Sequence, residues 1–417
     1  MEKKIKGAWL IHHGQKLQTA ITSEFDAIGF AGKYGVLLSA ISSAAQTQLS
    51  NTQINALAKA NRLSPKTDVQ AILDELSRQK LINKGASGIE VLGLTSQAVL
   101  LHTATVFEES QKERIEDAAV ELAEMVSECP LSDKEAIQKI SDFHRISHES
   151  SNTLVKIGGE IGFFDSEKIS GNESLLFNGN LFKKNEAFKI SAVLSSLEAN
   201  ERASLSAANA QLASAGCLPL ETIHKVLGRE LFTKLHAIGM FDVSFVANDL
   251  GKKYFVTRPA AFSKFTGSIA DDALDLAKAF VTCLTYGMTV SPYAKGRIQM
   301  IEKLMDKLIS GHSVGPATAI GSDYQALELK GVVKITAAQN GMFTMRLLKP
   351  EVGKLALAVI QEGNIAAEAI TQMPSAAVTI YAGPEENRTI VRKRATVATK
   401  ATVTKWVNDI RTGLLKK

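Results

Sequence analysis

Histidine is the first residue type in this chain that could bind a metal ion. His144 and His148 are four residues apart, so on one helix they would present two imidazole nitrogens to the same side. The residues between them are Arg-Ile-Ser, which lack the glutamate of a zinc hydrolase, and a third ligand is not evident. His12 and His13 are neighbours, and neighbours in a strand point to opposite faces. We therefore predict no metal site.

Phosphate-binding loops and reactive thiols are the next candidates. Residues 158–162 read Gly-Gly-Glu-Ile-Gly, without the Lys-Ser or Lys-Thr that completes a phosphate loop, and residues 311–315 lack it too. Cys217 and Cys283 lie among apolar residues and are expected in the core. The carboxylates are dispersed along predicted helices. The sequence therefore predicts a non-enzymatic protein without catalytic residues or cofactors.

The composition indicates an ordinary globular protein. The chain has 417 residues, of which 45% are hydrophobic and 22% are charged. No apolar run approaches the ~18 residues that a membrane span needs, and the first residues lack the features of a signal peptide. Three cysteines far apart in the sequence suit a reducing compartment. We expect a cytoplasmic protein that does not enter a membrane.

Positive charge is concentrated at the end of the chain. The net charge is +5, but residues 375–417 hold nine basic and three acidic residues. That segment is therefore +6 and the rest of the chain is −1. Such asymmetry favours an anionic partner over a merely solubilising tail. The basic residues are Arg388, Arg392, Lys393, Arg394, Lys400, Lys405, Arg411, Lys416 and Lys417.

A leucine followed five residues later by an apolar pair recurs three times. Another apolar residue precedes each leucine by three positions, which places both on one face of a helix. A turn and a second apolar stretch follow each pair. Recurrence at one spacing indicates one supersecondary unit that is used several times. The copies are Leu76 with Leu81 and Ile82, Leu235 with Met240 and Phe241, and Leu327 with Val332 and Val333.

Local signals predict where the helices and hairpins of these copies begin. Ser50 is expected to cap the second helix of the first copy. Ser64 is expected to cap its third helix, with Pro65 at the first helical position. A hairpin is predicted over residues 82–94. In the second copy, the turn at residues 248–251 is a strong hairpin signal.

The segments between the copies are mostly helical in pattern. Residues 6–12 are predicted to form a short strand. A long connector over residues 97–127 is polar on all sides at 108–114, so it should break there. Ser132 and Glu135 form a capping-box pattern. Residues 162–165 resemble 239–242, which indicates a possible degenerate further copy.

The predicted fold is mainly α with small β-hairpins, an α+β class in which tandem units are joined by helical connectors. The boundaries follow the capping and turn signals described above. They are an N-terminal extension at 1–34, a first copy at 35–105, a connector with the possible degenerate copy at 106–190, a second copy at 191–265, a connector and third copy at 266–373, and a basic tail at 374–417.

The order helix, helix, turn, helix, two-stranded wing resembles the winged helix-turn-helix superfamily of bacterial regulators and replication initiators. The resemblance covers about half of the chain and rests on architecture and hydrophobic spacing. It implies that the third helix enters the DNA major groove while the wing touches the backbone or minor groove. Winged helices also serve as protein-docking modules, so both roles stay open.

Candidate DNA-binding residues are polar or basic side chains expected on the third helices, on the wings and in the tail. The third helix of the third copy has no arginine and favours a packing role. The candidates are Lys66, Thr67, Gln70, Arg78 and Lys84 in the first copy; Arg229, Lys234, Lys252, Lys253 and Arg258 in the second; and Arg388, Arg392, Lys393, Arg394 and Lys400 in the tail.

Two functions follow from these patterns. The first is a DNA-binding protein, such as a transcription regulator, a replication initiator or the DNA-binding subunit of a larger complex, with double-stranded DNA as its partner. The second is a protein-interaction scaffold, self-associating or part of a phage-defence or chromosome-maintenance machine. Acidic residues such as Asp74 on the third helices favour the second function, because they repel phosphate.

Overall fold

A computed structural model describes residues 1–20, 24–44, 48–85, 88–91, 94–170, 173–249, 251–265 and 271–368. The predicted class is confirmed, since helices alternate with four small antiparallel sheets of three strands each. In every sheet the third strand lies in the centre, between the first strand and the second. This order is compatible with repeated winged-helix-like units.

Each sheet belongs to a unit with the element order helix, strand, helix, helix, strand, strand. Unit 1 contains α2 (Asp26–Ser42), β1 (Gln48–Ser50), α3 (Asn51–Ala60), α4 (Val69–Arg78), β2 (Ile82–Gly85) and β3 (Gly88–Val91). Unit 2 contains α6 (Arg114–Glu128), β4 (Leu131–Ser132), α7 (Asp133–His144), α8 (His148–Ile161), β5 (Asp165–Ser170) and β6 (Glu173–Phe177).

The remaining two units repeat this order in the second half of the chain. Unit 3 contains α10 (Ala199–Ala215), β7 (Cys217–Pro219), α11 (Leu220–Leu227), α12 (Arg229–Ala237), β8 (Asp242–Asn248) and β9 (Gly251–Thr257). Unit 4 contains α15 (Ile301–Ile309), β10 (Ser313–Ala317), α16 (Thr318–Asp323), α17 (Gln325–Leu329), β11 (Val333–Ala337) and β12 (Phe343–Leu347).

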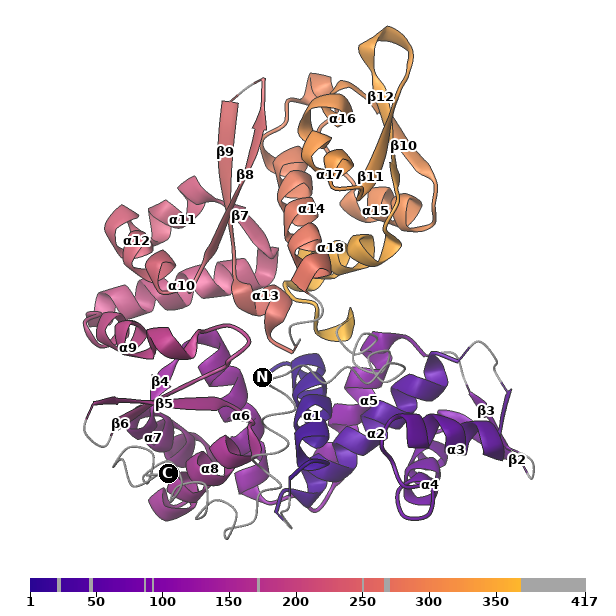
Figure 1. Cartoon of the computed structure of the whole chain (residues 1–417), viewed down its shortest axis with the longest axis vertical. Helices are drawn as coiled ribbons and strands as arrows, with labels where there is room; N and C mark the ends of the chain where they lie inside the picture. Colours follow the sequence, from indigo (N-terminus) through magenta and orange to yellow (C-terminus); the bar gives the residue numbers. More distant parts are fainter. Residues whose placement is uncertain are drawn as a thin grey trace, which may run out of the picture.

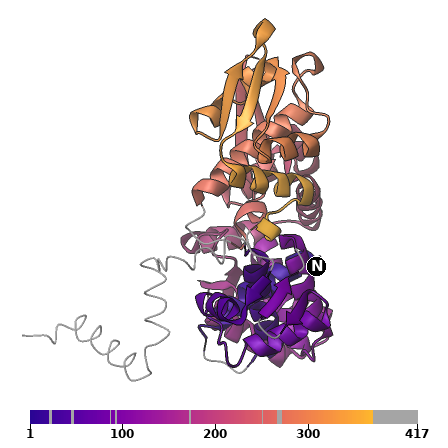
Figure 2. The ribbon, with the colours of Figure 1, turned by 90° about the vertical axis from the view of Figure 1, so that its right-hand side faces the viewer.

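The described residues also form six helices and three short 3₁₀ turns besides these elements, some between the units, some at the ends of the described chain and one, η4, within the hairpin of unit 4. They are α1 (Lys3–Leu17), α5 (Ser96–Glu109), α9 (Ala187–Ser195), α13 (Pro259–Ser263), α14 (Asp271–Thr289) and α18 (Pro350–Glu362), with η1 (Lys184–Glu186), η3 (Tyr293–Lys295) and η4 (Gln339–Gly341). Figure 1 shows one unit at each corner of the molecule. Units 1 and 2 form a lower lobe, and units 3 and 4 form an upper lobe stacked on it (Figure 2).

Several predicted helix starts are confirmed by side-chain caps. The Ser50 hydroxyl accepts a hydrogen bond from the backbone N–H of Gln53 at 3.3 Å, and the Gln53 side chain accepts one from the N–H of Ser50 at 2.8 Å. Ser132 and Glu135 make the same reciprocal pair at the start of α7. The predicted break at residues 108–114 separates α5 from α6.

The strand predicted at residues 6–12 is wrong, because this segment lies within α1. Ala8, Trp9, Leu10 and Ile11 are all buried, so the helix is enclosed on most sides and shows no amphipathic period. A Cβ atom on Gly14 would lie 2.6 Å from the Cα of Gly32 in α2, so only glycine allows this close crossing of α1 and α2.

Two further predictions near helix ends need correction. The third helix of unit 1 begins at Val69 and not at Ser64, because the Asp68 carboxylate accepts the Ser64 N–H at 2.8 Å and closes a separate turn. His144 ends α7 and His148 begins α8, so the two imidazoles do not share one helix face. Arg145 between them adopts a left-handed conformation with φ of 53°.

Four charged side chains meet where the two lobes join. Arg258 and Lys264 flank α13 of the upper lobe, and they reach Glu124 and Glu128 on α6 of the lower lobe. Lys264 Nζ lies 2.8 Å from Glu124 and 3.1 Å from Glu128, and the Lys264 side chain is only 5% exposed. Arg258 is also buried and forms an ion pair with Glu128. We call these four residues the seam cluster.

Neutral contacts surround the seam cluster. The indole N–H of Trp9 donates to Glu124 at 2.7 Å, and the Trp9 ring packs edge-on against Phe265 with centroids 4.9 Å apart. Asn178 donates to the carbonyl oxygen of Lys264 at 3.0 Å. Buried charges carry a large desolvation cost, which only good geometry and additional hydrogen bonds offset. The seam therefore specifies how the two lobes are placed relative to each other.

The ionisation of the seam cluster follows from the same contacts. Burial alone would raise the pKa of Glu128, but the Lys264 ammonium and the Arg258 guanidinium outweigh it and hold this pKa below its usual range. Burial alone would lower the pKa of Lys264, but the carboxylates of Glu124 and Glu128 outweigh it and raise this pKa. Glu128 and Lys264 are therefore both charged at neutral pH.

We predict that Lys264→Met destabilises the native chain by about 3–5 kcal/mol at pH 7, because two carboxylates lose their buried cation. The defect should shrink as the pH falls below about 4. A carboxyl group whose folded pKa is lowered contributes stability only above its unfolded pKa, near 4.3, and this contribution is lost as the pH falls through the folded pKa. Urea unfolding at pH 7 and at about pH 3 measures both effects.

Lys134→Met is the matched control for this substitution. Its side chain is largely exposed and lies 3.9 Å from Glu173, a surface pair that contributes little. The control should change stability by less than about 0.5 kcal/mol. A Lys264→Met protein that unfolds at the same urea concentration as the control would show that the seam cluster is not needed for stability.

Candidate nucleic-acid interface

The candidate residues of unit 1 lie together, but acidic neighbours engage most of them. Gln70 donates to Asp74 at 3.0 Å, and Lys84 of the hairpin forms an ion pair with the same carboxylate. Hydrogen bonds from Lys84 and then Gln70 lower the pKa of Asp74. The wing is thus joined to the third helix by its own charges, which leaves Lys84 less available to an external phosphate.

Arg78 is engaged in a similar way. Its guanidinium donates to Glu75 at 2.7 and 2.8 Å and also pairs with Glu109 of α5. These two partners, Glu75 first, raise the pKa of Arg78. Lys66 and Thr67 are exposed in the turn before α4. Unit 1 therefore presents a third-helix surface that is close to neutral.

In unit 3 the candidate cations of the wing lack acidic partners, whereas one of those on the third helix is paired. On α12, Lys234 is paired with Glu230 at 3.1 Å, which raises its pKa, while Arg229 is exposed at the start of the helix. Lys252 and Lys253 are exposed on β9, and neither makes an ion pair with any residue that the structure describes. The wing thus carries two available cations.

Arg258 departs from its expected place at the surface. It directly follows β9, but it is buried in the seam cluster beside Glu128. The sequence pattern put it on the exposed wing because alternation along a strand does not show where a second lobe covers it. The tail candidates Arg388, Arg392, Lys393, Arg394 and Lys400 lie outside the described residues.

An aromatic pair on the unit 3 wing is missing from the sequence-based candidates. Phe245 and Tyr254 are direct cross-strand partners, 55% and 42% exposed, with ring centroids 6.0 Å apart. The Lys252 ammonium lies 5.2 Å from the centre of the Phe245 ring. On the opposite face of the hairpin, Val246 and Phe255 are buried. The strand period of two could have identified this pair as outward-facing.

Unit 4 holds two cations that sequence reasoning also missed. Lys334 of β11 and Arg346 of β12 are direct cross-strand partners, and both are exposed. No carboxylate of the described chain forms a salt bridge with either, although Glu328 is near and accepts the N–H of Ile335 at 3.0 Å. Like charges directly opposite each other destabilise a sheet. An anion bound between Lys334 and Arg346 would reduce the repulsion between their charges.

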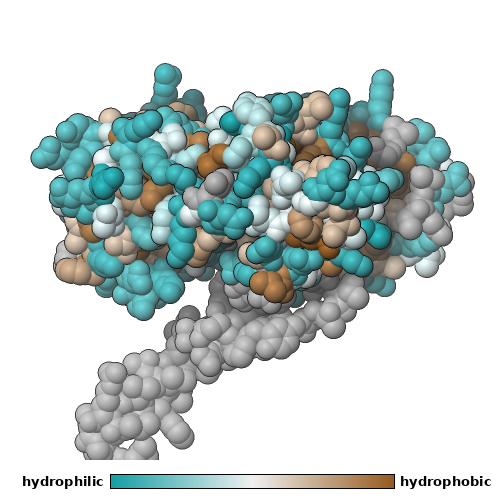
Figure 3. Space-filling view, turned by 90° about the horizontal axis from the view of Figure 1, so that it is seen from above, coloured by the Kyte–Doolittle hydropathy of each residue, from teal (hydrophilic) through white to brown (hydrophobic). Residues whose placement is uncertain are grey.

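The wings of units 3 and 4 lie at the same end of the molecule. Both hairpins extend toward the top of Figure 1, whereas the hairpins of units 1 and 2 lie in the lower lobe. Seen from above, hydrophilic side chains cover most of this end, with small apolar patches between them (Figure 3). We call the exposed aromatic and basic side chains of these two wings the wing end: Phe245, Lys252, Lys253, Tyr254, Lys334 and Arg346. Lys252 and Lys253 lie near the tip of the unit 3 hairpin, whereas Lys334 and Arg346 lie near the base of the unit 4 hairpin.

Residues 311–315 read Gly-His-Ser-Val-Gly, which is the Gly-x-Ser-x-Gly spacing of a nucleophilic serine. That motif requires a sharp turn from a strand into a helix. Here Ser313 is the first residue of β10 and follows α15, so the order of elements is reversed. Ser313 is exposed beside Arg346 and makes no hydrogen bond to a histidine among the described residues.

The imidazole rings of His12 and His13, which could act as bases or metal ligands, are largely removed from solvent. His13 stacks on Phe163 with ring centroids 4.1 Å apart, and burial, followed by nearby His12 and Lys16, keeps its pKa well below the ordinary value. Burial and then Lys16 lower the pKa of His12 to about 3. Within the described ranges no three histidine, cysteine or acidic side chains are grouped to hold a metal ion, and no helix has the length and apolarity to span a bilayer.

Comparison of the chain with known protein families, with curated proteins and with solved structures finds no match.

The buried cysteines lead to a direct prediction. Burial raises the pKa of Cys217 to about 12, despite a hydrogen bond from Thr285, and burial followed by Asp323 raises that of Cys283 to about 12. Near pH 8 the raised pKa keeps both thiols protonated and therefore poorly nucleophilic. Cys217 and Cys283 should therefore resist a chromogenic thiol reagent in the native chain and react with it in denaturing urea. The absorbance of the released chromophore measures the reaction. Rapid modification of either in native buffer would contradict this packing.

Proposed function

We propose that this chain is a non-enzymatic DNA-binding protein that contacts double-stranded DNA through its wing end. The observation that carries the proposal is the set of four exposed cations without acidic partners on two adjacent wings: Lys252, Lys253, Lys334 and Arg346. A protein that neutralises phosphates releases condensed counterions, and this release supplies much of the affinity for DNA. The basic tail predicted from the sequence would add to it.

The arrangement of these side chains supports contact with a nucleic acid. Lys334 and Arg346 face each other across two strands, and a phosphate placed between them would relieve their repulsion. Phe245 and Tyr254 offer exposed aromatic faces beside Lys252. Aromatic side chains on a basic surface can stack on bases or insert at a base step. Within the proposal, the wings of units 3 and 4 are the principal contacts with DNA.

We predict that Lys334→Glu combined with Arg346→Glu weakens DNA binding and flattens its dependence on salt. Losing two phosphate contacts should reduce the slope of log affinity against log salt concentration by about 2. Fluorescence anisotropy with a duplex of mixed sequence, at several salt concentrations, measures both quantities. Lys252→Glu combined with Lys253→Glu should act in the same way.

The matched control is Lys303→Glu combined with Lys307→Glu on α15, which makes the same charge change at exposed positions of unit 4 outside the wing end. The control protein should keep most of the slope of log affinity against log salt concentration. Absence of binding even at low salt would overturn the proposed function. Binding that survives reversal at the wings but disappears when residues 385–417 are removed would assign DNA contact to the tail alone.

A protein-interaction scaffold is the alternative function. The near-neutral surface of α4, where Asp74 and Glu75 engage Lys84 and Arg78, favours it for unit 1. Exposed Phe143 of unit 2, at 73%, also favours it, because a large exposed apolar side chain can anchor a partner. A stable partner recovered in a pull-down, together with no DNA binding at any salt concentration, would select this function.

A further inference from the structure

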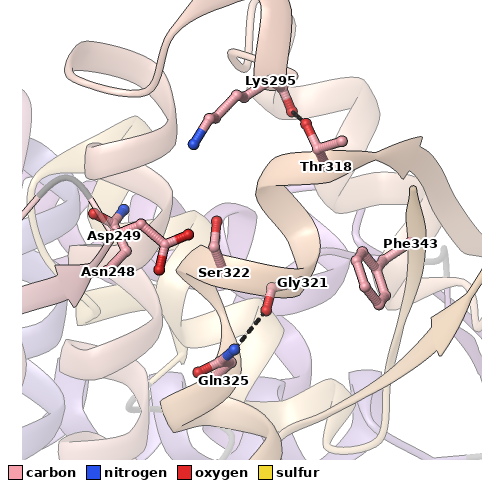
Figure 4. A pocket seen from close by; sticks show the side chains of 8 residues that line it. All are labelled: Asn248, Asp249, Lys295, Thr318, Gly321, Ser322, Gln325 and Phe343. Carbon is pink, nitrogen blue, oxygen red and sulfur yellow. Dashed lines mark hydrogen bonds between the residues drawn. The ribbon is translucent and has the colours of Figure 1, made fainter. Parts of the chain in front are cut away.

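A cavity of about 270 Å³ lies between the tip of the unit 3 wing and unit 4 (Figure 4). Asn248 and Asp249 line it from the end of β8, and Lys295 lines it from η3. Thr318 and Ser322 belong to α16, and Phe343 begins β12. Four separate segments of the chain thus converge on one space, and most of the groups that they bring are polar.

Two opposite charges face this cavity without pairing to each other. In Figure 4 the Lys295 ammonium extends into the space from above, and the Asp249 carboxylate extends into it from the wing. Across the described part of the chain, neither group makes a salt bridge. A ligand with a single charge would satisfy one of them and be repelled by the other. A ligand with both charges would satisfy both.

A buried carboxylate holds the wall of this cavity in place. Asp323 is 5% exposed and accepts hydrogen bonds from the Asn248 side chain and the Ser322 hydroxyl, both at 2.8 Å. Asn248 also donates to the Tyr286 hydroxyl at 2.8 Å. A buried carboxylate is tolerated only when it is well hydrogen-bonded. The polar groups of the wing tip and of α16 are therefore fixed relative to each other before any ligand arrives.

We propose that this cavity binds a free α-amino acid, whose carboxylate pairs with Lys295 and whose ammonium pairs with Asp249. The volume lies just below the ~300–1,000 Å³ of pockets for drug-sized ligands, which suits a molecule of this size. The Phe343 ring on the far wall offers a surface for the side chain of the ligand. This site is separate from the cations of the wing end and does not depend on DNA binding.

The test is a thermal-unfolding assay of the full chain without DNA, in which each of the twenty protein L-amino acids is added singly. A ligand that binds only the folded state raises the melting temperature. We expect at least one amino acid to raise it by about 2 °C or more at millimolar concentration. The increase should disappear in Lys295→Met and in Asp249→Asn. Calorimetric titration then measures the affinity of the active amino acid.

Lys303→Met is the matched control, because Lys303 is an exposed lysine of unit 4 that does not line the cavity. It should keep the full increase. Failure of all twenty amino acids to stabilise the unsubstituted chain would overturn the proposal, as would an increase that persists in both cavity variants. The assay contains no DNA, so its outcome is independent of whether the wing end binds a nucleic acid.

Discussion

The seam cluster is the constraint on which the arrangement of the whole chain depends. Lys264 and Arg258 come from the upper lobe, and Glu124 and Glu128 come from the lower lobe, so neither lobe can neutralise its own buried charges. An apolar seam would tolerate sliding, because hydrophobic contact is not directional. Paired charges tolerate little displacement, since an unpaired buried charge is costly. The cluster therefore favours one relative placement of the four units.

Within that arrangement, one scaffold carries four different surfaces. Each unit packs a small sheet against helices through inward-facing apolar side chains, and neighbouring units share these buried cores, as where Leu175 and Phe177 of unit 2 join the core of unit 3. Outward-facing positions do not have to meet this requirement, and their side chains differ from unit to unit. Unit 1 pairs its cations internally through Asp74 and Glu75, whereas the wings of units 3 and 4 leave theirs unpaired. Units that share one fold therefore need not share one binding function.

Much of this fold could be predicted from the sequence, because its signals are local. The spacing from Leu235 to Phe241 identifies a helix end and a strand start, and Ser50 identifies a cap, since neighbouring residues decide these features. The helix α1 escaped prediction because it is enclosed on most sides and lacks an amphipathic period.

The candidate site was less predictable than the fold. Arg258 was expected at the surface because a second lobe leaves no trace in the pattern of one strand. Lys334 and Arg346 are twelve residues apart, and only the register of β11 with β12 shows that they face each other. Arg78 and Lys84 of the first copy were also candidates, but they pair with Glu109 and Asp74, which lie on elements that are separate in the sequence.

The strand β9 joins the tip of the unit 3 wing to the seam between the lobes. It begins at the exposed wing tip, next to Lys252, and the residue that follows its end is Arg258 in the seam. Seven extended residues at about 3.4 Å each make it a strut of roughly 24 Å, braced on both sides by β7 and β8. Force applied to the wing is therefore transmitted along a stiff backbone to the junction between the lobes. A load on this wing would be borne by the ionic contacts of the seam.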